Sequence, residues 1–152
     1  MAELAVLIGL QAAGKTTFYR EHLAATHEHV SKDNWPNAGR RERRQLAVVD
    51  ALLAAGRDVA VDNTNPSARL RAALLEVARR HGAHTVAYWF PPDKAGSMAR
   101  NSARPDETRV PDVGLFATLG RLTEPSPEED FDVVRVVRFD GWGGFTVEDR
   151  CD

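Results

Sequence analysis

Short apolar runs alternate with longer amphipathic segments along the whole chain. Strands are predicted at about 4–8, 28–31, 58–62, 84–90 and 133–139, with a short strand-like segment at 145–147. Helices are predicted at about 15–25, 41–55, 66–81, 93–102 and 111–122. Within the helix at 66–81, Leu70, Leu74 and Val77 recur at helical spacing, and Asn65 is expected to cap its start.

This alternation predicts an α/β fold. Strands separated by helices of this length imply right-handed crossovers and a parallel sheet covered on both faces. The 152 residues suit a single domain, 1–152, that buries a substantial core. Ligands of such sheets bind beyond the carboxyl ends of the strands. We therefore expect residues 9–16, Asp33 and Asp62, which all follow strands, to meet in one cleft.

Composition is that of an ordinary globular protein, with 43% hydrophobic and 28% charged residues. Cys151 is the one cysteine, which excludes a disulfide framework within one chain. No apolar run has membrane-spanning length, so we expect a cytoplasmic protein without a membrane partner. The net charge of −2 argues against a globally basic nucleic-acid binder. His22, His27 and His29 lack a metal-site pattern and are expected at the surface.

Residues 9–16, Gly-Leu-Gln-Ala-Ala-Gly-Lys-Thr, match the phosphate-binding pattern Gly-x-x-x-x-Gly-Lys-[Ser/Thr] directly after an apolar strand. The glycines let backbone N–H groups surround a phosphate chain, and the helix start adds further donors. Lys15 can reach the β- and γ-phosphates, and the Thr16 hydroxyl can ligate Mg²⁺. A dinucleotide fold is disfavoured, because its second glycine is replaced by Gln11. The predicted nucleoside triphosphate site comprises Gly9, Gln11, Ala12, Ala13, Gly14, Lys15, Thr16 and Thr17.

Two acidic residues follow predicted strands. Asp33 is placed to accept the proton of an acceptor hydroxyl, the task of the carboxylate in phosphoryl-transfer enzymes, or it caps a turn. Asp62 can hold Mg²⁺ through water or support an acceptor site that includes Thr64, or it can organise its turn. Both interpretations of Asp62 are open at this point.

Several cationic and aromatic side chains have two interpretations each. Arg100 and Arg104 share a helix face, and Arg109 follows in a polar segment that can fold over a nucleotide. Their spacing alone also fits a solvated helix end. The basic run 40–44 can bind an anionic substrate or a nucleic-acid backbone, or form a solvated face. Trp35 can stack on a base or sugar, or cover the edge of the core.

The order of these motifs resembles the kinase domain of the 5′-hydroxyl polynucleotide kinases in the P-loop kinase superfamily, as a stand-alone, AAA-type and zeta-toxin-like module. The matching segments are 9–16, 31–33, 61–66 and 100–104, and 110–112 and 125–134 extend the similarity over nearly the whole chain. The resemblance implies a three-layer P-loop kinase-type sheet with five core strands, helices on both faces and an arginine-bearing lid.

The resemblance also implies ATP as the donor, Asp33 as the general base and Arg104 as the lid arginine on the transferring phosphate, with Arg100 nearby. The family usually places an arginine three residues after the base, where this chain has Pro36. Either Arg40 or Arg41 takes over its role, or the acceptor lacks the corresponding phosphate.

The leading hypothesis is an ATP- and Mg²⁺-dependent kinase of a 5′-hydroxyl end of RNA or DNA. Lys15, Asp33 and Arg104 would be catalytic, and Thr16 and Asp62 would hold the metal. The alternatives are a kinase of a small alcohol, such as a sugar, nucleoside or antibiotic, and a nucleotide-binding ATPase switch.

Overall fold

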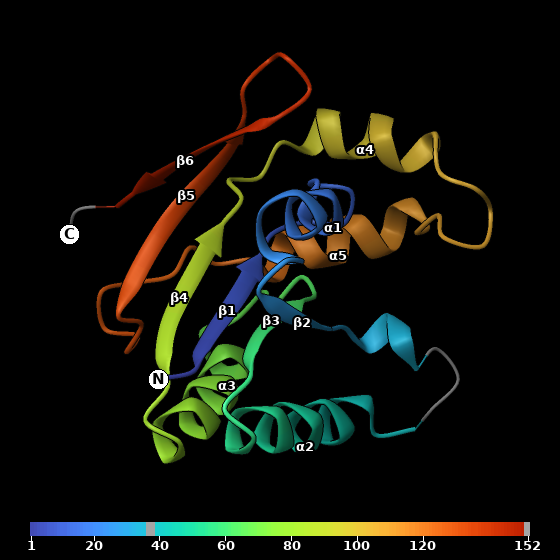
Figure 1. The fold of residues 1–152 in the computed structure, drawn as a ribbon. Coiled ribbons are helices and arrows are strands. Elements are labelled where there is room, and N and C mark those ends of the chain that lie inside the picture. Colours follow the sequence, from blue (N-terminus) through green and yellow to red (C-terminus); the bar gives the residue numbers. More distant parts are fainter. Residues whose placement is uncertain (36–38, 151–152) are drawn as a thin grey trace.

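A single six-stranded sheet forms the centre of the protein (Figure 1). The computed structural model describes residues 1–35 and 39–150. The strands are β1 (Glu3–Ile8), β2 (His27–Val30), β3 (Asp58–Asp62), β4 (His84–Trp89), β5 (Val133–Phe139) and β6 (Phe145–Asp149). Their order is β2-β3-β1-β4-β5-β6. β1 to β5 are parallel, and β6 pairs antiparallel with β5. The predicted parallel core is therefore confirmed, with one antiparallel strand added at its edge.

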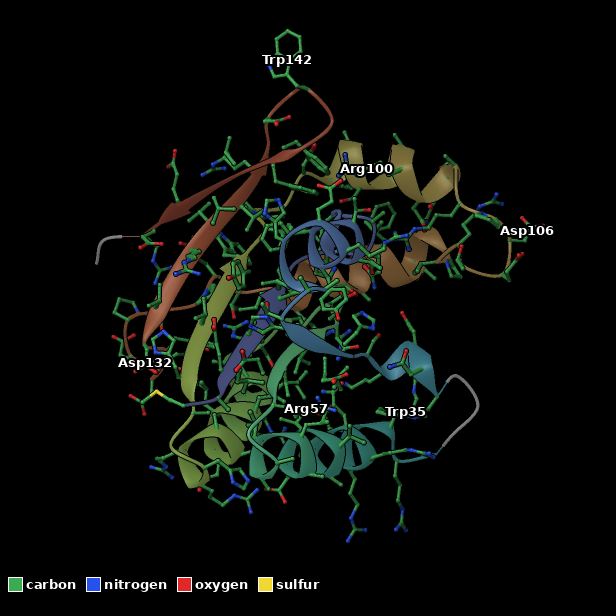
Figure 2. The ribbon with its side chains drawn as sticks, viewed as in Figure 1. Trp35, Arg57, Arg100, Asp106, Asp132 and Trp142 are labelled. Atoms are coloured by element: carbon green, nitrogen blue, oxygen red, sulfur yellow. The ribbon has the colours of Figure 1, made fainter. Side chains whose placement is uncertain are left out.

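The hairpin between β5 and β6 is organised by Asp140. Its carboxylate accepts the backbone N–H groups of Trp142, at 2.6 Å, and Gly144, at 3.0 Å. Gly141 and Gly143 have positive φ angles of 84° and 88°, which favour glycine. The turn leaves the Trp142 side chain 92% exposed at its tip (Figure 2).

The helices are α1 (Lys15–Phe18), α2 (Arg41–Ala54), α3 (Ala68–Arg80), α4 (Lys94–Ser102) and α5 (Asp112–Arg121). Two short turns, the π-helical η1 (Tyr19–Leu23) and the 3-10 turn η2 (Lys32–Asn34), complete the structure. The helix predicted at 15–25 is thus α-helical for only four residues and continues as η1. The Ala24 N–H bonds to the carbonyl of Tyr19, five residues earlier, which widens the last turn.

The start of α3 differs from the prediction. Its N-cap is Ser67, whose hydroxyl accepts the N–H of Leu70 at 3.3 Å. Asn65 is buried with a left-handed φ of 45°, and its side-chain amide donates to the carbonyl of Leu7 at 2.7 Å. The predicted capping role of Asn65 is therefore wrong, because its side chain ties the turn after β3 to the end of β1 instead.

Different helices cover the two faces of the sheet (Figure 1). On one face, α2 and α3 bury Val49, Leu53, Leu74 and Val77 against the aliphatic side chains of β1 and β3. On the other face, α1 and η1 pack Phe18 and Leu23 against residues of β1, β4 and β5. The predicted three-layer arrangement is confirmed. α4 and α5 lie near α1, toward the carboxyl ends of the strands. Within the described residues, every helix is too short or too polar to cross a lipid bilayer.

A buried arginine joins α3 to the segment before β5. Arg71 is fully buried, and its guanidinium donates two hydrogen bonds to the carboxylate of Glu129, at 2.7 and 2.9 Å. It also donates to the backbone carbonyls of Asn65, at 3.0 Å, and Thr123, at 3.1 Å. Burial disfavours the charged form of Glu129, but the hydrogen bonds from Arg71 and from the Ser126 backbone hold its pKa below the usual value.

Replacing Arg71 by methionine is expected to lower the free energy of unfolding by about 3–5 kcal/mol, because it removes the cationic partner of the Glu129 carboxylate and a donor to two backbone carbonyls. Urea-induced unfolding followed by circular dichroism measures this loss. Arg79→Ala on the same helix is a matched control, since Arg79 is 74% exposed in its ion pair with Glu76. Equal midpoints for the two variants would contradict the structural role of Arg71.

Candidate functional site

The phosphate loop, residues 9–16, connects β1 to α1. A side chain at Gly9 would stand 2.8 Å from the Cβ of Phe90, so only glycine fits there. Gly14, the N-cap of α1, has a left-handed φ of 92°. The N–H of Gly9 donates to the backbone carbonyl of Thr64 at 3.1 Å. These restraints hold the loop at the carboxyl ends of β1 and β3, as the phosphate pattern predicts. An acceptor-binding role for the Thr64 side chain stays a prediction.

Lys15 is buried inside this loop. Its Nζ donates to the carbonyls of Gly9, at 3.0 Å, and Leu10, at 2.5 Å. Burial lowers the pKa of Lys15 to about 8. The negative charges of Asp62 and Asp33 oppose this shift, and the positive charge of Arg104 adds to it. The charges of three predicted site residues, which lie far apart in the sequence, thus act on one ammonium group.

ATP binding is expected to weaken above pH 8. Lys15 loses its positive charge as the pH rises through its pKa of about 8, and a triphosphate favours the charged amine. Binding above this pH therefore requires a proton, and the Kd should rise up to about tenfold per pH unit. Calorimetric titrations from about pH 7 to 9.5 measure this slope, which Lys15→Gln should abolish. A pH-independent Kd in the wild-type protein would contradict contact between Lys15 and the triphosphate.

Thr16 and Asp62 are in direct contact. The Thr16 hydroxyl donates to Asp62 Oδ2 at 2.7 Å, and His29 Nε2 lies 2.9 Å from the same oxygen. Burial raises the pKa of Asp62, but the hydrogen bonds from His29 and Thr16 and the charge of Lys15 outweigh it and keep the pKa below its usual value. Asp62 is therefore ionised at neutral pH beside the phosphate loop.

These two residues suit a hard divalent cation, because a hydroxyl and a carboxylate are oxygen donors. Within the residues that the structure describes, no group of three or more His, Cys, Asp or Glu side chains could hold a metal. A cation beside Thr16 and Asp62 would therefore need phosphate oxygens and water as its other ligands, as Mg²⁺ does in kinase sites.

Two histidines correct the expectation that all three lie at the surface. His27 is buried, with 8% of its surface exposed, and His29 is half-buried against Tyr19, with 4.6 Å between the ring centroids. His22 is exposed, as expected. Alternate residues of a strand share one face, and in β2 both histidines contact Tyr19 of η1, whose hydroxyl donates to the carbonyl of His27. The alternation of side chains along a β-strand, rather than the spacing of metal ligands, therefore explains where these histidines lie.

Asp33 lies on η2, directly after β2. Its backbone N–H donates to Ser31 Oγ at 3.2 Å, and its side chain is exposed. In the described part of the chain, the Asp33 carboxylate makes no hydrogen bond or ion pair. A carboxylate without a protein partner is available to a ligand, which fits its predicted role as a base. Pro36, at the position where the resemblance to polynucleotide kinases led us to expect an arginine, lies outside the described residues.

The arginines at the start of α2 differ in their contacts. Arg41 is half-buried, and its Nη1 donates to the backbone carbonyl of Lys32 at 3.3 Å. Arg40 is exposed with a left-handed φ of 54°. Arg44 lies over the ring of Trp35, 5.2 Å from its centroid, and Trp35 packs on the core. Trp35 therefore covers the edge of the core, while substrate binding by Arg40 and Arg41 stays a prediction.

Arg100 is attached to the phosphate loop. Its Nε donates to the carbonyl of Ala12 at 2.6 Å, and its guanidinium lies 4.6 Å from the ring centroid of Phe139. Ala12 has a left-handed φ of 57°, part of the tight path of the loop. Gln11 attaches α5 to the same loop, with 2.8 Å between its Nε2 and the hydroxyl of Thr118. The loop is therefore held from both α4 and α5.

The lid loop, residues 103–111, joins α4 to α5. Asn101 closes it: the side-chain amide donates to the Val110 carbonyl at 2.6 Å and accepts the Val110 N–H at 2.9 Å. Arg109 forms an ion pair with Asp106 and donates to the backbone carbonyl of Arg104. The Arg104 guanidinium, by contrast, has no hydrogen bond or ion pair with any other described residue. Within the described lid loop, Arg104 is therefore the arginine that is free of protein partners, and its charge acts on Lys15.

A cavity of about 240 Å³ opens beside the phosphate loop. Its lining includes Ala13, Arg100 and Ser97 together with aromatic and proline side chains, namely Phe90, Pro91, Pro92, Phe139 and Phe145. The Ser97 hydroxyl is buried there without a partner among the described residues. Sequence reasoning did not identify Phe139 or Phe145, because only the pairing of β5 with β6 brings them to this place.

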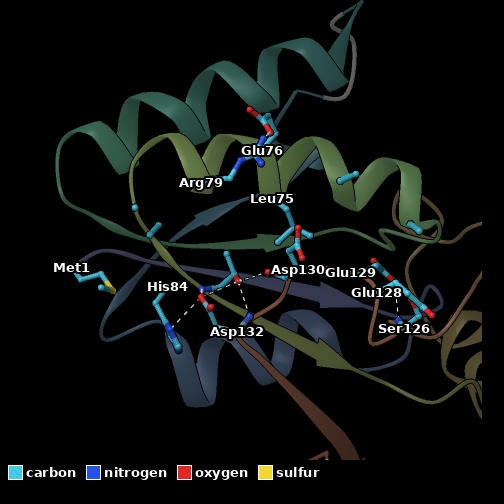
Figure 3. Close-up of a pocket in the computed structure, with 15 residues that line it drawn as sticks. Met1, Leu75, Glu76, Arg79, His84, Ser126, Glu128, Glu129, Asp130 and Asp132 are labelled. Carbon is cyan, nitrogen blue, oxygen red and sulfur yellow. Dashed lines mark hydrogen bonds and ion pairs between the residues drawn. The ribbon is translucent and has the colours of Figure 1, made fainter. Parts of the chain in front are cut away.

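A second cavity, of about 870 Å³, lies at the opposite edge of the sheet (Figure 3). α3, the start of β4 and the segment before β5 form its walls, and its lining residues include Glu76, Glu128 and Asp130. None of the predicted site residues lines this cavity. We do not assign the nucleotide to it, because ligands of parallel α/β sheets bind at the other ends of the strands.

The chain is similar to a protein family and to several solved structures. A family described as "AAA domain" matches residues 4–125. The fold is similar to a sugar kinase from Janibacter sp. HTCC2649, with a TM-score of 0.67, 18% identity and coverage of 90% of this chain and 86% of that one. Kti12 from Chaetomium thermophilum, solved in complex with ADP-AlF3, has a TM-score of 0.69 at 18% identity, covering 90% and 89%. A fungal RNA kinase has a TM-score of 0.64 at 18% identity, covering 91% of this chain but 38% of that chain.

Identities of this size establish a shared fold and not a shared substrate. The family match, however, spans most of the sequence, including the phosphate loop, Asp33, Asp62 and the lid loop. The chain therefore belongs to the AAA domain family and has the fold of the P-loop kinases.

Proposed function

We propose that the protein transfers the γ-phosphoryl group of ATP to an alcohol, with the 5′-hydroxyl end of RNA or DNA as the preferred acceptor. The observation that carries this proposal is the phosphate loop with Lys15 buried in it and Asp62 hydrogen-bonded to Thr16 at 2.7 Å. The charges of Arg104 and Asp33 also act on Lys15. A phosphate cradle, a carboxylate without a protein partner and an uncommitted arginine are the parts that phosphoryl transfer requires. A nucleotide-binding switch requires the phosphate loop but neither the carboxylate nor the arginine.

The reaction follows from these positions. When ATP enters, Lys15 exchanges the Gly9 and Leu10 carbonyls for phosphate oxygens. Asp33 accepts the proton of the acceptor hydroxyl, and the oxygen of that hydroxyl forms a bond to the γ-phosphorus. The bond between the γ-phosphorus and the β-γ bridging oxygen breaks, and ADP leaves with that oxygen. Arg104 neutralises the charge on the phosphoryl oxygens during transfer. A bound Mg²⁺, held by Thr16 and Asp62, would supply further charge neutralisation at the β- and γ-phosphates.

The nucleoside part of ATP fits the 240 Å³ cavity beside Ala13. Its aromatic, proline and arginine walls suit a flat base, which gains from stacking on such surfaces. The position next to the phosphate loop allows one ligand to occupy both. Arg100 borders the cavity and bonds to the loop, so it is placed between base and phosphates.

Two features favour a nucleic-acid acceptor. Arg40, Arg43 and Arg44 are exposed at the start of α2, the helix that follows Asp33 and η2 in the chain, where they can bind backbone phosphates. The fold similarity to a fungal RNA kinase supports the same acceptor. The net charge of −2 and the similarity to a sugar kinase favour a small alcohol instead. This second acceptor class uses the same catalytic residues.

A transfer screen with γ-labelled ATP separates these possibilities. It uses 5′-hydroxyl RNA and DNA oligonucleotides and a set of sugars, nucleosides and aminoglycosides, with Lys15→Ala as the inactive control. Label on oligonucleotides, with a KM that rises steeply with salt, is the expected result. Label confined to small alcohols would show that the acceptor is a small alcohol and not a nucleic acid. Hydrolysis without transfer to any acceptor would overturn the proposed function.

A further inference from the structure

The backbone of Lys32, the residue before Asp33, is hydrogen-bonded on both sides of its Cα. The N–H of Lys32 donates to Oδ1 of Asn63 at 2.9 Å, and the carbonyl of Lys32 accepts from Arg41 at 3.3 Å. The hydroxyl of Ser31 lies 3.4 Å from the same Asn63 oxygen. Asn63, on the turn after β3, therefore contacts the segment that leads into η2 and Asp33.

Asn63 also reaches α2. Its Nδ2 donates to Oε1 of Gln45 at 2.5 Å, and Gln45 is almost fully buried, with 1% of its surface exposed. One amide thus joins three elements: the turn after Asp62, the loop of Asp33 and helix α2. Both ends of the Asn63 side chain are used, the oxygen as acceptor and the nitrogen as donor.

A role in holding its own turn does not explain Asn63. The neighbouring Asn65 performs that task, with its amide bonded to the carbonyls of Leu7, Val61 and Asn63. All hydrogen bonds of the Asn63 side chain instead lead away from the turn, to the Asp33 loop and to α2. Asp33 itself has no side-chain partner in the described chain, so its position depends on the backbone that carries it.

We propose that Asn63 and Gln45 are positioning residues that fix the Asp33 carboxylate relative to the phosphate loop. This inference rests on the proposed function, because it assigns the two amides to the geometry of the general base. Asn63 directly follows Asp62, the proposed metal ligand, so one turn contributes to the position of both carboxylates. Misplacement of a catalytic group by about 1 Å costs on the order of 100-fold in rate. Loss of Asn63 should therefore lower kcat and leave ATP binding largely intact.

The decisive experiment compares Asn63→Leu in the wild-type and in the Asp33→Asn background. Asn63→Leu is expected to lower the single-turnover transfer rate by roughly 30–100-fold with Asp33 present, with less than about a twofold change in the ATP Kd. If Asn63 acts through Asp33, the same change in the Asp33→Asn background should cost less than about twofold. An equal loss in both backgrounds would overturn the inference, because it indicates a general structural role.

A conservative variant guards against misfolding. Asn63→Asp keeps both acceptor bonds to the Asp33 loop, and Gln45 can rotate its amide to donate to the new carboxylate, so this variant should retain most of the wild-type rate. Gln45→Leu should show a smaller loss than Asn63→Leu. His81→Ala, which removes a 2.6 Å contact with Asp50 on another part of α2, is the matched control and should transfer normally.

The outcomes separate the inference from the proposed function. Full transfer by Asp33→Asn alone would overturn the general-base assignment and the inference with it. Loss of transfer in Asp33→Asn together with a normal rate in Asn63→Leu would overturn only the positioning role. Equal losses in Asn63→Leu and Asn63→Asp, with both proteins folded by circular dichroism, would also overturn it.

Discussion

Replacement of Asp33 by asparagine is expected to lower kcat for phosphoryl transfer by about 10²–10⁴-fold. The amide has nearly the shape of the carboxylate but cannot take the proton of the acceptor hydroxyl. ATP binding should change little, because Asp33 is exposed and reaches the phosphate loop only through its electrostatic effect on Lys15. Single-turnover transfer measures the rate, and calorimetry measures the ATP Kd.

Asp50→Asn is a matched control for this experiment. Asp50 is an acid on α2 whose contacts are with Arg80 and His81, outside the site. Its replacement should leave transfer unchanged. A wild-type rate for Asp33→Asn would contradict the role of Asp33 as general base, whereas loss of ATP binding would mean that Asp33 contributes to the nucleotide site instead.

Replacement of Arg104 by alanine is expected to lower kcat by about 10³-fold or more, the effect of removing an arginine that stabilises transferring phosphate. The guanidinium has no partner in the described chain, so its loss leaves no protein group unsatisfied and should not change the melting temperature. Arg104→Lys keeps the charge but not the planar, bidentate geometry, and it should restore only part of the rate.

The ATP Kd of the Arg104→Ala variant shows whether Arg104 contacts the phosphoryl group only in the transition state or already binds ATP in the ground state. If Arg104 acts on the transferring group, kcat and kcat/KM should fall together while the Kd changes little. Arg121→Ala, an exposed arginine at the end of α5, should behave as the wild type. A large rise in Kd with an unchanged kcat would contradict the catalytic assignment and make Arg104 a nucleotide-binding residue.

The sequence predicted the architecture because its strongest signals are local. The aliphatic run at 4–8 and the glycine-containing loop after it specify a strand, a turn and a helix start without help from the rest of the chain. The rule that ligands bind at the carboxyl ends of parallel strands then placed Asp33 and Asp62 beside Lys15. In the structure the charges of Asp62 and Asp33 both act on the Lys15 ammonium, while their roles in a reaction stay predictions.

Other parts of the site depend on contacts that local patterns do not contain. His29 meets Asp62 only because β2 pairs with β3, and Asn63 meets Gln45 only because α2 packs beside that pair. Ser67 and Asn65 are both good capping residues, and the choice between them was decided by a carbonyl of β1, far away in sequence. Register and packing over long sequence separations supply this information.

The contacts of Lys15 with its own loop have a consequence for the nucleotide-free protein. An ammonium that lost its phosphate partner would otherwise remain in the interior without compensation, a costly arrangement for a charge. In the nucleotide-free structure the Gly9 and Leu10 carbonyls accept hydrogen bonds from this ammonium, so the charge is not left without polar partners. An incoming nucleotide must therefore compete with two peptide oxygens for the N–H groups of Lys15.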